Sequence, residues 1–229
     1  MYVVPLVLFI LLLVLGPQWW ARYTFRRYAG VLPRIPGTGG ELARHLLDRF
    51  GMPDVPVEKT EKGGDHYDPE RRAVCLSPDN HDHKSLTAVA VVAHEVGHAL
   101  QHQRSEPMLA LRHRLIKLAQ TTQQLGAGAM FLLPVAMAIT RAPAAGIIMA
   151  VIGFGSMASA TLVHLVTLPV ELDASFRKAL PVLIAGQYIQ PRDEAAVRRV
   201  LRAAALTYVA GSLASLLNLA RWLAFLRRA

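Results

Sequence analysis

The sequence predicts a mainly α-helical integral membrane protein, in which a small core with a β-hairpin or edge strand packs on three to four membrane helices. Three observations predict this class. Apolar residues make up 53% of the 229 residues, and they gather in long blocks between charged segments. These blocks are rich in Gly, Ala and Ser, which allow membrane helices to approach closely. Only two short segments, 55–60 and 73–76, have the composition of strands.

Residues 1–21 are predicted to form an N-terminal membrane anchor. Val3 to Trp20 contains no charged residue over 18 positions, which is long enough to cross a bilayer. It ends in two tryptophans, as interfacial anchors do, and lacks the basic start and cleavage site of a secretory signal. Arginines follow at once, at positions 22, 26 and 27. Because positive charge beside a membrane helix stays on the cytoplasmic side, residues 22–117 are expected to lie inside the cell.

The region 22–117 is expected to have secondary structure of its own. Thr38 and Glu41 fit a capping box, which predicts a helix that ends near Phe50. Val55 to Thr60 and Ala73 to Leu76 then read as two short strands, because Gly and Pro residues between them supply turns.

The next predicted helix, Ser85 to Gln103, contains the sequence His94-Glu95-Val96-Gly97-His98. His94 and His98 are one helical turn apart, so both imidazoles leave the same face of the helix. Two imidazoles in this arrangement can bind one Zn²⁺, and Glu95 can reach a water on the zinc as general base. The alternative is a coincidence of two core histidines, which the complete H-E-x-x-H pattern disfavours.

A third ligand decides which type of zinc site this is. A histidine six residues after the second one is excluded, because Arg104 occupies that position. His102 would lie about 12 Å from His94 along a straight helix, too far to share an ion. The remaining option is a carboxylate from a later helix, and Glu171 and Asp173 are the candidates. Both could instead be solvated charges at a membrane boundary.

Two more membrane segments are predicted after the motif. Residues 118–170 are expected to form a helical hairpin, because Leu125 to Thr140 and Ala142 to Pro169 are apolar blocks separated by Arg141. Residues 171–202 are expected to return to the cytoplasmic side, with the third-ligand helix and a polar, basic segment. Residues 203–229 are predicted to form a C-terminal membrane helix. The predicted topology is multi-pass, with the metal motif facing the cytoplasm.

The net charge of +9 does not indicate a nucleic-acid partner. The basic residues flank the apolar blocks, which favours contact with the anionic headgroups of a lipid bilayer. Cys75 is the only cysteine, so the chain has neither an intrachain disulfide nor a cysteine cluster that could bind a metal.

The chain resembles the YugP-like membrane zinc metallopeptidases over nearly its whole length. The likeness is carried by the N-terminal anchor and by Asp65 to Pro69, Ala93 to His102, Leu168 to Ser175 and Ala204 to Ala210. This family is similar to HtpX and the CAAX prenyl endopeptidases, gluzincins in which a Glu on a later helix completes the zinc site within an E-x-x-x-D motif. The resemblance implies Zn²⁺ as cofactor, Glu171 as third ligand and the bacterial cytoplasmic (inner) membrane as location. Ser175 stands at the Asp position, and Asp173 is expected to orient a zinc histidine in its place.

These features together predict a membrane-bound zinc-dependent endopeptidase that acts on a protein or peptide substrate. His94, His98 and Glu171 hold Zn²⁺, and a zinc-activated water attacks the scissile carbonyl with Glu95 as general base. Tyr208 and His66 are the candidates for a second donor to the developing oxyanion. An extended substrate is expected to pair with the edge of the strand that comes directly before the metal helix.

Two other functions account for fewer of the features. A non-catalytic membrane scaffold or partner-binding protein with structural zinc would need a fourth protein ligand, commonly Cys, and Cys75 is far from the motif. A metal transporter would need polar residues across the bilayer midplane, where the apolar blocks offer little beyond His164. The sequence carries no signature of the oligomeric state.

Overall fold

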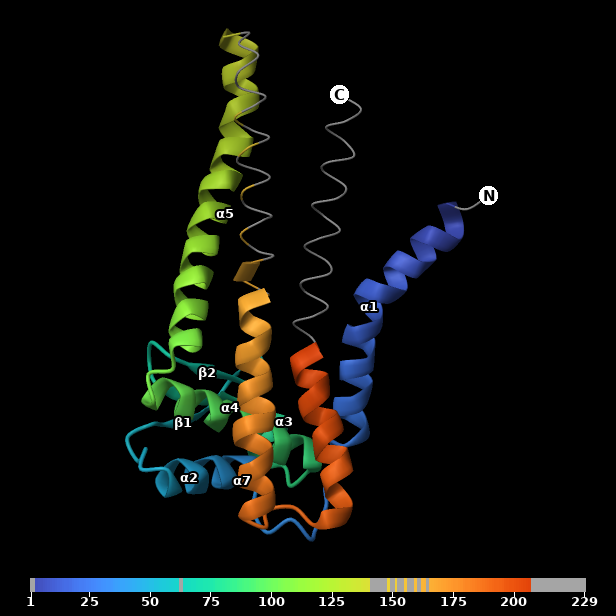
Figure 1. Cartoon of the computed structure of the whole chain (residues 1–229), viewed down its shortest axis with the longest axis vertical. Coiled ribbons are helices and arrows are strands. Elements are labelled where there is room, and N and C mark those ends of the chain that lie inside the picture. Colours follow the sequence, from blue (N-terminus) through green and yellow to red (C-terminus); the bar gives the residue numbers. More distant parts are fainter. Residues whose placement is uncertain are drawn as a thin grey trace.

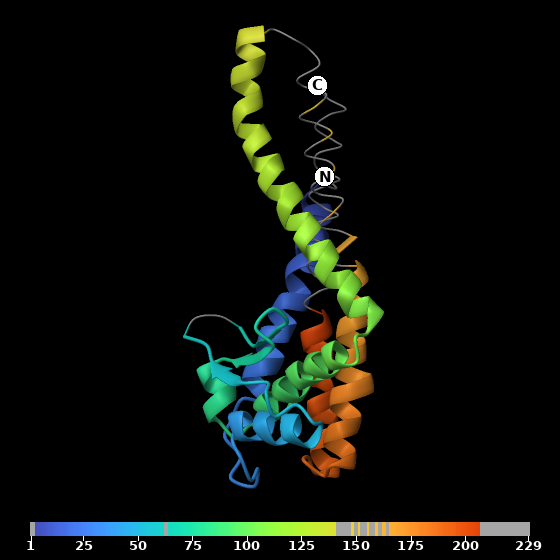
Figure 2. The same cartoon turned by 90° about the vertical axis from the view of Figure 1, so that its left-hand side faces the viewer.

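The computed structural model describes residues 3–61, 64–140 and 165–206, together with residues 148, 151, 155, 159, 162 and 163. A small sheet packs at one side of a body of helices, and helices α1 (Val3–Arg27) and α5 (Pro107–Thr140) extend from this body in the same direction (Figures 1 and 2). The predicted combination of many helices with a small sheet is confirmed.

Helix α2 (Gly39–Arg49) begins with the predicted capping box. The Thr38 hydroxyl accepts the backbone N–H of Glu41 at 3.3 Å, and the Glu41 carboxylate accepts the backbone N–H of Thr38 at 2.7 Å. Two N–H groups that the first turn leaves without helical partners are thereby satisfied. The helix ends at Arg49, two residues before Gly51, whose φ of 70° suits glycine, and it packs its buried face on α4.

Strands β1 (Val57–Lys59), β2 (His66–Asp68) and β3 (Ala73–Leu76) form a sheet in the order β1-β3-β2. β3 pairs in parallel with β1 and antiparallel with β2. All four residues of β3 are buried, because neighbours cover both of its edges and α4 packs on the sheet. The short helix α3 (Pro78–Asp82) connects β3 to α4.

The prediction that the strand before the metal helix is an edge strand was wrong. β3 is central, and the hairpin is formed by β2 and β3 through the turn at residues 69–72. β2 was missed because His66-Tyr67-Asp68 shows no alternation of apolar and polar residues, and only its pairing with β3 makes it a strand. The edge strand on this side of the sheet is therefore β2.

Helix α4 (Leu86–Gln103) lies at the centre of the body, with fifteen of its residues buried. Ser85 caps its start by accepting the backbone N–H of Ala88 at 3.0 Å. Gly97 lies between the two motif histidines and faces the carbonyl oxygen of Ala174, which a Cβ at Gly97 would approach to 2.9 Å. The absence of a side chain at Gly97 therefore allows the chain around residue 174 to pack directly on α4.

The remaining described residues form a helical hairpin beside α4. Residues 165–172 are helical and continue into the π-helix η1 (Asp173–Ala179) and α7 (Leu180–Ala185). After a turn, η2 (Pro191–Asp193) leads into helical residues 194–206, which run back alongside (Figure 1). Buried apolar residues of both arms, among them Leu183, Val197 and Leu201, belong to one core cluster with α4.

The predicted integral membrane fold requires a correction. Among the residues that the structure describes, no helix combines the length and the apolar character needed to cross a bilayer. The prediction of three to four membrane helices was therefore wrong. The apolar blocks continue into segments that carry charge and pack on the body: the first part of α5 carries Arg112 and Arg114, and residues 165–172 carry the buried Glu171. Most of the predicted spans at 142–169 and 203–225 lie outside the described residues.

Candidate metal centre

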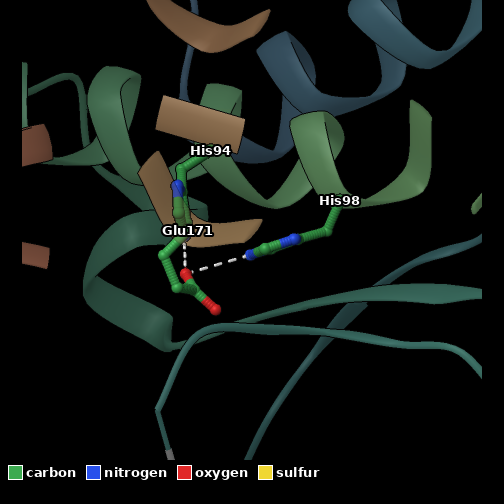
Figure 3. A group of neighbouring side chains, drawn as sticks. All are labelled: His94, His98 and Glu171. Atoms are coloured by element: carbon green, nitrogen blue, oxygen red, sulfur yellow. Dashed lines mark hydrogen bonds and ion pairs between the residues drawn. The ribbon is translucent and has the colours of Figure 1, made fainter. Parts of the chain in front are cut away.

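Helix α4 presents both motif histidines on its buried face. His94 and His98 are each 5% exposed, and their ring centroids lie 4.6 Å apart, as expected for residues one turn apart. Both Nε2 atoms point toward Glu171, which approaches from the helical residues 165–172 (Figure 3). The structure thus brings together the three residues that the sequence proposed as metal ligands.

The spacing of the three donor atoms suits zinc. Glu171 Oε2 lies 3.0 Å from His94 Nε2 and 3.2 Å from His98 Nε2, and the donor atoms of the group all lie within 4.8 Å of one another. Tetrahedral zinc with bonds of about 2.0–2.1 Å separates neighbouring ligand atoms by about 3.3 Å. Two imidazole nitrogens and one carboxylate oxygen are also a ligand set that catalytic zinc uses.

The other nitrogen of each imidazole is held by a neighbouring side chain. His94 Nδ1 lies 3.0 Å from the Ser175 hydroxyl oxygen, and His98 Nδ1 lies 2.9 Å from the Gln101 amide oxygen. When both Nδ1–H groups donate to these oxygens, both Nε2 atoms carry lone pairs directed at a carboxylate oxygen. In this tautomer both Nε2 atoms can bind a cation together with Glu171 Oε2, so the residues present fit a zinc ion.

Asp173 contacts the centre indirectly, through Gln101. It accepts a hydrogen bond from Gln101 Nε2 at 2.8 Å and pairs with the buried Lys178, which also pairs with Glu106 at 2.9 Å. Asp173 was expected to bond a zinc histidine, but Ser175 takes that role for His94. The physical reason is reach, because Gln101 lies between Asp173 and His98.

Glu95 is buried beside the three donors and lines a cavity of about 380 Å³. Burial raises the pKa of Glu95 to about 7; the charges of Glu171 and Asp65 act in the same direction, while His94 and the backbone N–H of Tyr67 oppose it. A carboxylate whose pKa lies near neutrality can both accept and return a proton at physiological pH.

Glu171, in contrast to Glu95, is held in its ionised form. Its side chain is fully buried, and burial alone would raise its pKa, but His98 and His94 outweigh this and hold the pKa of Glu171 below its ordinary value. Glu171 is therefore an anion at neutral pH, as a carboxylate ligand of zinc must be.

Of the two proposed oxyanion donors, the structure describes only His66, and it does not bring His66 to the donors described above. His66 lies on β2 with an exposed side chain, its Nδ1 is 3.0 Å from the carbonyl oxygen of Gly64, and it is absent from the described lining of the Glu95 cavity. Tyr208 lies outside the described residues. Both assignments stay predictions. His102, which the sequence excluded as a ligand, bonds the Tyr67 hydroxyl at 2.8 Å instead.

The roles of three residues of the centre were not predicted from the sequence. Gln101 and Ser175 stand three and four residues after His98 and Glu171, so helical spacing could have suggested them. Arg112, on α5, places its Nη2 3.1 Å from Glu171 Oε1. No spacing rule could have found Arg112, because the contact joins two different helices.

Comparison with known proteins indicates a zinc peptidase, in agreement with the geometry of the site. Residues 3–227 match the family described as "Putative neutral zinc metallopeptidase". The chain is 38% identical over 222 residues to "Putative membrane protease YugP" of Bacillus subtilis (strain 168), covering 95% of each chain. No solved structure matches the chain. The resemblance seen in the motifs is thus confirmed, with zinc as the cofactor. The chain belongs to this family of neutral zinc metallopeptidases.

Proposed function

We propose that this protein is an endopeptidase that uses a zinc ion held by His94, His98 and Glu171, with Glu95 as general base. One observation carries the proposal. The three donor atoms converge within 4.8 Å of one another, and the carboxylate next to them is buried at the wall of a cavity of about 380 Å³. Peptide hydrolysis needs this combination of a metal, a base and space for a substrate.

Zinc bound at these residues supplies a Lewis acid that lowers the pKa of a water and polarises the scissile carbonyl. The protein's own part is the movement of one proton. Glu95 accepts the proton of the attacking water as the new C–O bond forms, and it returns this proton to the amine as the C–N bond breaks. Its raised pKa of about 7 suits both transfers.

The position of β2 supports an extended substrate beside Glu95. The Tyr67 backbone N–H bonds the Glu95 carboxylate, so the edge of β2 that faces away from β3 lies at the candidate site. An extended peptide can add to such an edge by main-chain hydrogen bonds. Peptides bound in this way would be recognised mainly by their backbone, which suits a family of peptidases.

The ligand count favours catalytic zinc over the structural zinc of a scaffold. Structural sites use four protein ligands, whereas the group found among the described residues contains three. The fourth corner is therefore available to water. The name of the Bacillus relative refers to a membrane protease, which supports a further proposal that this chain also acts in association with a membrane.

The decisive experiment separates zinc binding from catalysis with Glu95→Gln. Purified wild type and variant should each carry about one zinc per chain, because Glu95 is a base and not a ligand. Hydrolysis of an unfolded protein substrate should fall by about 10²-fold or more in the variant. Glu61→Gln, which makes the same change at an exposed position, is the control and should behave as wild type.

Two results would contradict the proposal. Undiminished hydrolysis by Glu95→Gln would exclude Glu95 as the base. A wild type that binds zinc stoichiometrically but cleaves no peptide or unfolded protein would favour the scaffold.

A further inference from the structure

Arg112 reaches the candidate metal centre from outside the elements that supply the ligands. It lies near the start of α5, its side chain is 17% exposed, and its Nη2 atom is 3.1 Å from Glu171 Oε1. Glu171 itself is completely buried. The contact is therefore an ion pair largely shielded from water, where electrostatic attraction is stronger than at the surface.

The two oxygens of Glu171 have different surroundings. Oε2 faces both histidine Nε2 atoms, at 3.0 and 3.2 Å, whereas Oε1 faces Arg112. Among the described residues, Oε1 accepts no hydrogen bond of good geometry, so the ion pair with Arg112 is the interaction that offsets its burial. Rotation of the carboxylate that moved Oε1 toward the histidines would break this ion pair.

The different surroundings of the two Glu171 oxygens matter because a carboxylate can bind a metal through one oxygen or through both. With Oε1 held by Arg112, Glu171 offers only Oε2, and two imidazoles plus one oxygen make three ligands. A second carboxylate oxygen would occupy or crowd the position that a catalytic zinc keeps for water.

We propose that Arg112 is a positioning residue that holds Glu171 as a one-oxygen ligand and so keeps the fourth position of the metal open. This inference rests on the proposed zinc site. A guanidinium suits the task because its planar, permanently charged group keeps a fixed orientation toward a carboxylate. An ion pair that only stabilised the packing of α5 would affect folding but not the number of ligands on the metal.

The test compares Arg112→Gln with Arg114→Gln in the full chain. Arg114 lies two residues later on the same helix and is exposed, so the control makes the same change of charge away from Glu171. Co²⁺ replaces zinc as the probe, because its visible absorption is intense with four ligands and weak with five. Zinc affinity is measured separately by competition with a chelator.

Wild type and Arg114→Gln should give the intense four-ligand cobalt spectrum. Arg112→Gln should give the weaker five-ligand spectrum, and its zinc affinity should fall by about 10–100-fold, as for other residues that orient a ligand. Arg112→Lys keeps a charge at this position and should recover part of both losses. If Arg112→Gln does not fold, Arg112→Met fills similar space without a charge and should show the same losses.

A cobalt spectrum and zinc affinity in the folded Gln or Met variant that equal those of Arg114→Gln would overturn the role of Arg112. Failure of the underlying zinc site looks different: wild type itself would then bind metal no better than His94→Ala.

Discussion

At the scale of single residues, the candidate centre shifts the pKa values of two buried carboxyl groups in opposite directions. Burial raises the pKa of Glu95 to about 7, whereas His98 and His94 hold the pKa of Glu171 below its ordinary value in spite of its burial. Neighbours thus shift the pKa values of two chemically similar side chains in opposite directions, which suits the roles proposed for them in proton transfer and metal binding. Glu171 remains charged, as the proposed ligand role requires, and Glu95 can exchange a proton near neutral pH.

The roles of Glu171 and Asp173 can be separated by zinc titration. Glu171→Gln should lower zinc affinity most, because a neutral amide is a poor substitute for an anionic ligand. Asp173→Asn should cost less, about 10–100-fold, because Asp173 acts on His98 through Gln101. Competition with a chelator measures both. Tight binding retained by Glu171→Gln but lost in Asp173→Asn would show that Asp173 is the ligand.

At the scale of elements, the position of η1 against α4 brings the two halves of the site together. Asp173 and Ser175 both belong to the π-helix η1, and they reach Gln101 and His94 on α4 respectively. The close approach depends on Gly97, which leaves room for the backbone at Ala174.

Gly97→Ala tests this close approach. The added Cβ would lie 2.9 Å from the Ala174 carbonyl oxygen, so one of the two helices must move. We expect a loss of about 1–3 kcal/mol in the free energy of unfolding, as for other overpacked sites, together with weaker zinc binding. Urea unfolding and zinc titration measure these effects. Gly30→Ala is the control, because a Cβ at Gly30 meets no atom within 4 Å. Equal stability and equal zinc affinity in both variants would show that the close packing of Ala174 on Gly97 contributes to neither property.

At the scale of the whole molecule, α5 joins the body close to the candidate centre. Arg112 pairs with Glu171, and Glu106, one residue before α5, pairs with Lys178. The rings of His113 on α5 and His102 on α4 lie 6.5 Å apart, and His102 also bonds Tyr67 on β2. The junction therefore connects the start of α5 with α4 and with the segment from Glu171 to Lys178, and α4 in turn with β2, through buried and partly buried polar groups.

Acidification should weaken this junction. Burial lowers the pKa of His102 and of His113, with the nearby Arg72 and Arg112 acting in the same direction. As the pH falls, these histidines take up protons in the unfolded chain before they do so in the folded protein, because a histidine in the unfolded chain has a pKa of about 6.5. The free energy of unfolding therefore decreases as the pH falls through that value and below it. Urea unfolding at about pH 7.5 and about pH 5.5 measures the loss, which His113→Gln should reduce. The control His83→Gln, at an exposed position, should leave it unchanged. An unchanged loss in His113→Gln would contradict this account.

The sequence by itself determined the features that depend on neighbours within a helical turn. The capping box of Thr38 and Glu41, the helix that follows Ser85 and the shared face of His94 and His98 all follow from contacts three or four residues apart. Such contacts form wherever the helix forms, so local spacing was enough to predict them.

Only the tertiary structure decided the features that join distant segments. β2 is a strand because it pairs with β3, the imidazoles are oriented by Ser175 and Gln101, and Arg112 meets Glu171 from a separate helix. Hydropathy likewise described the composition of the apolar blocks, but among the described residues no helix is long and apolar enough to cross a bilayer, so the predicted membrane fold was wrong. These outcomes depend on which surfaces pack together, and a linear pattern does not contain that information because the contacting residues lie far apart along the chain.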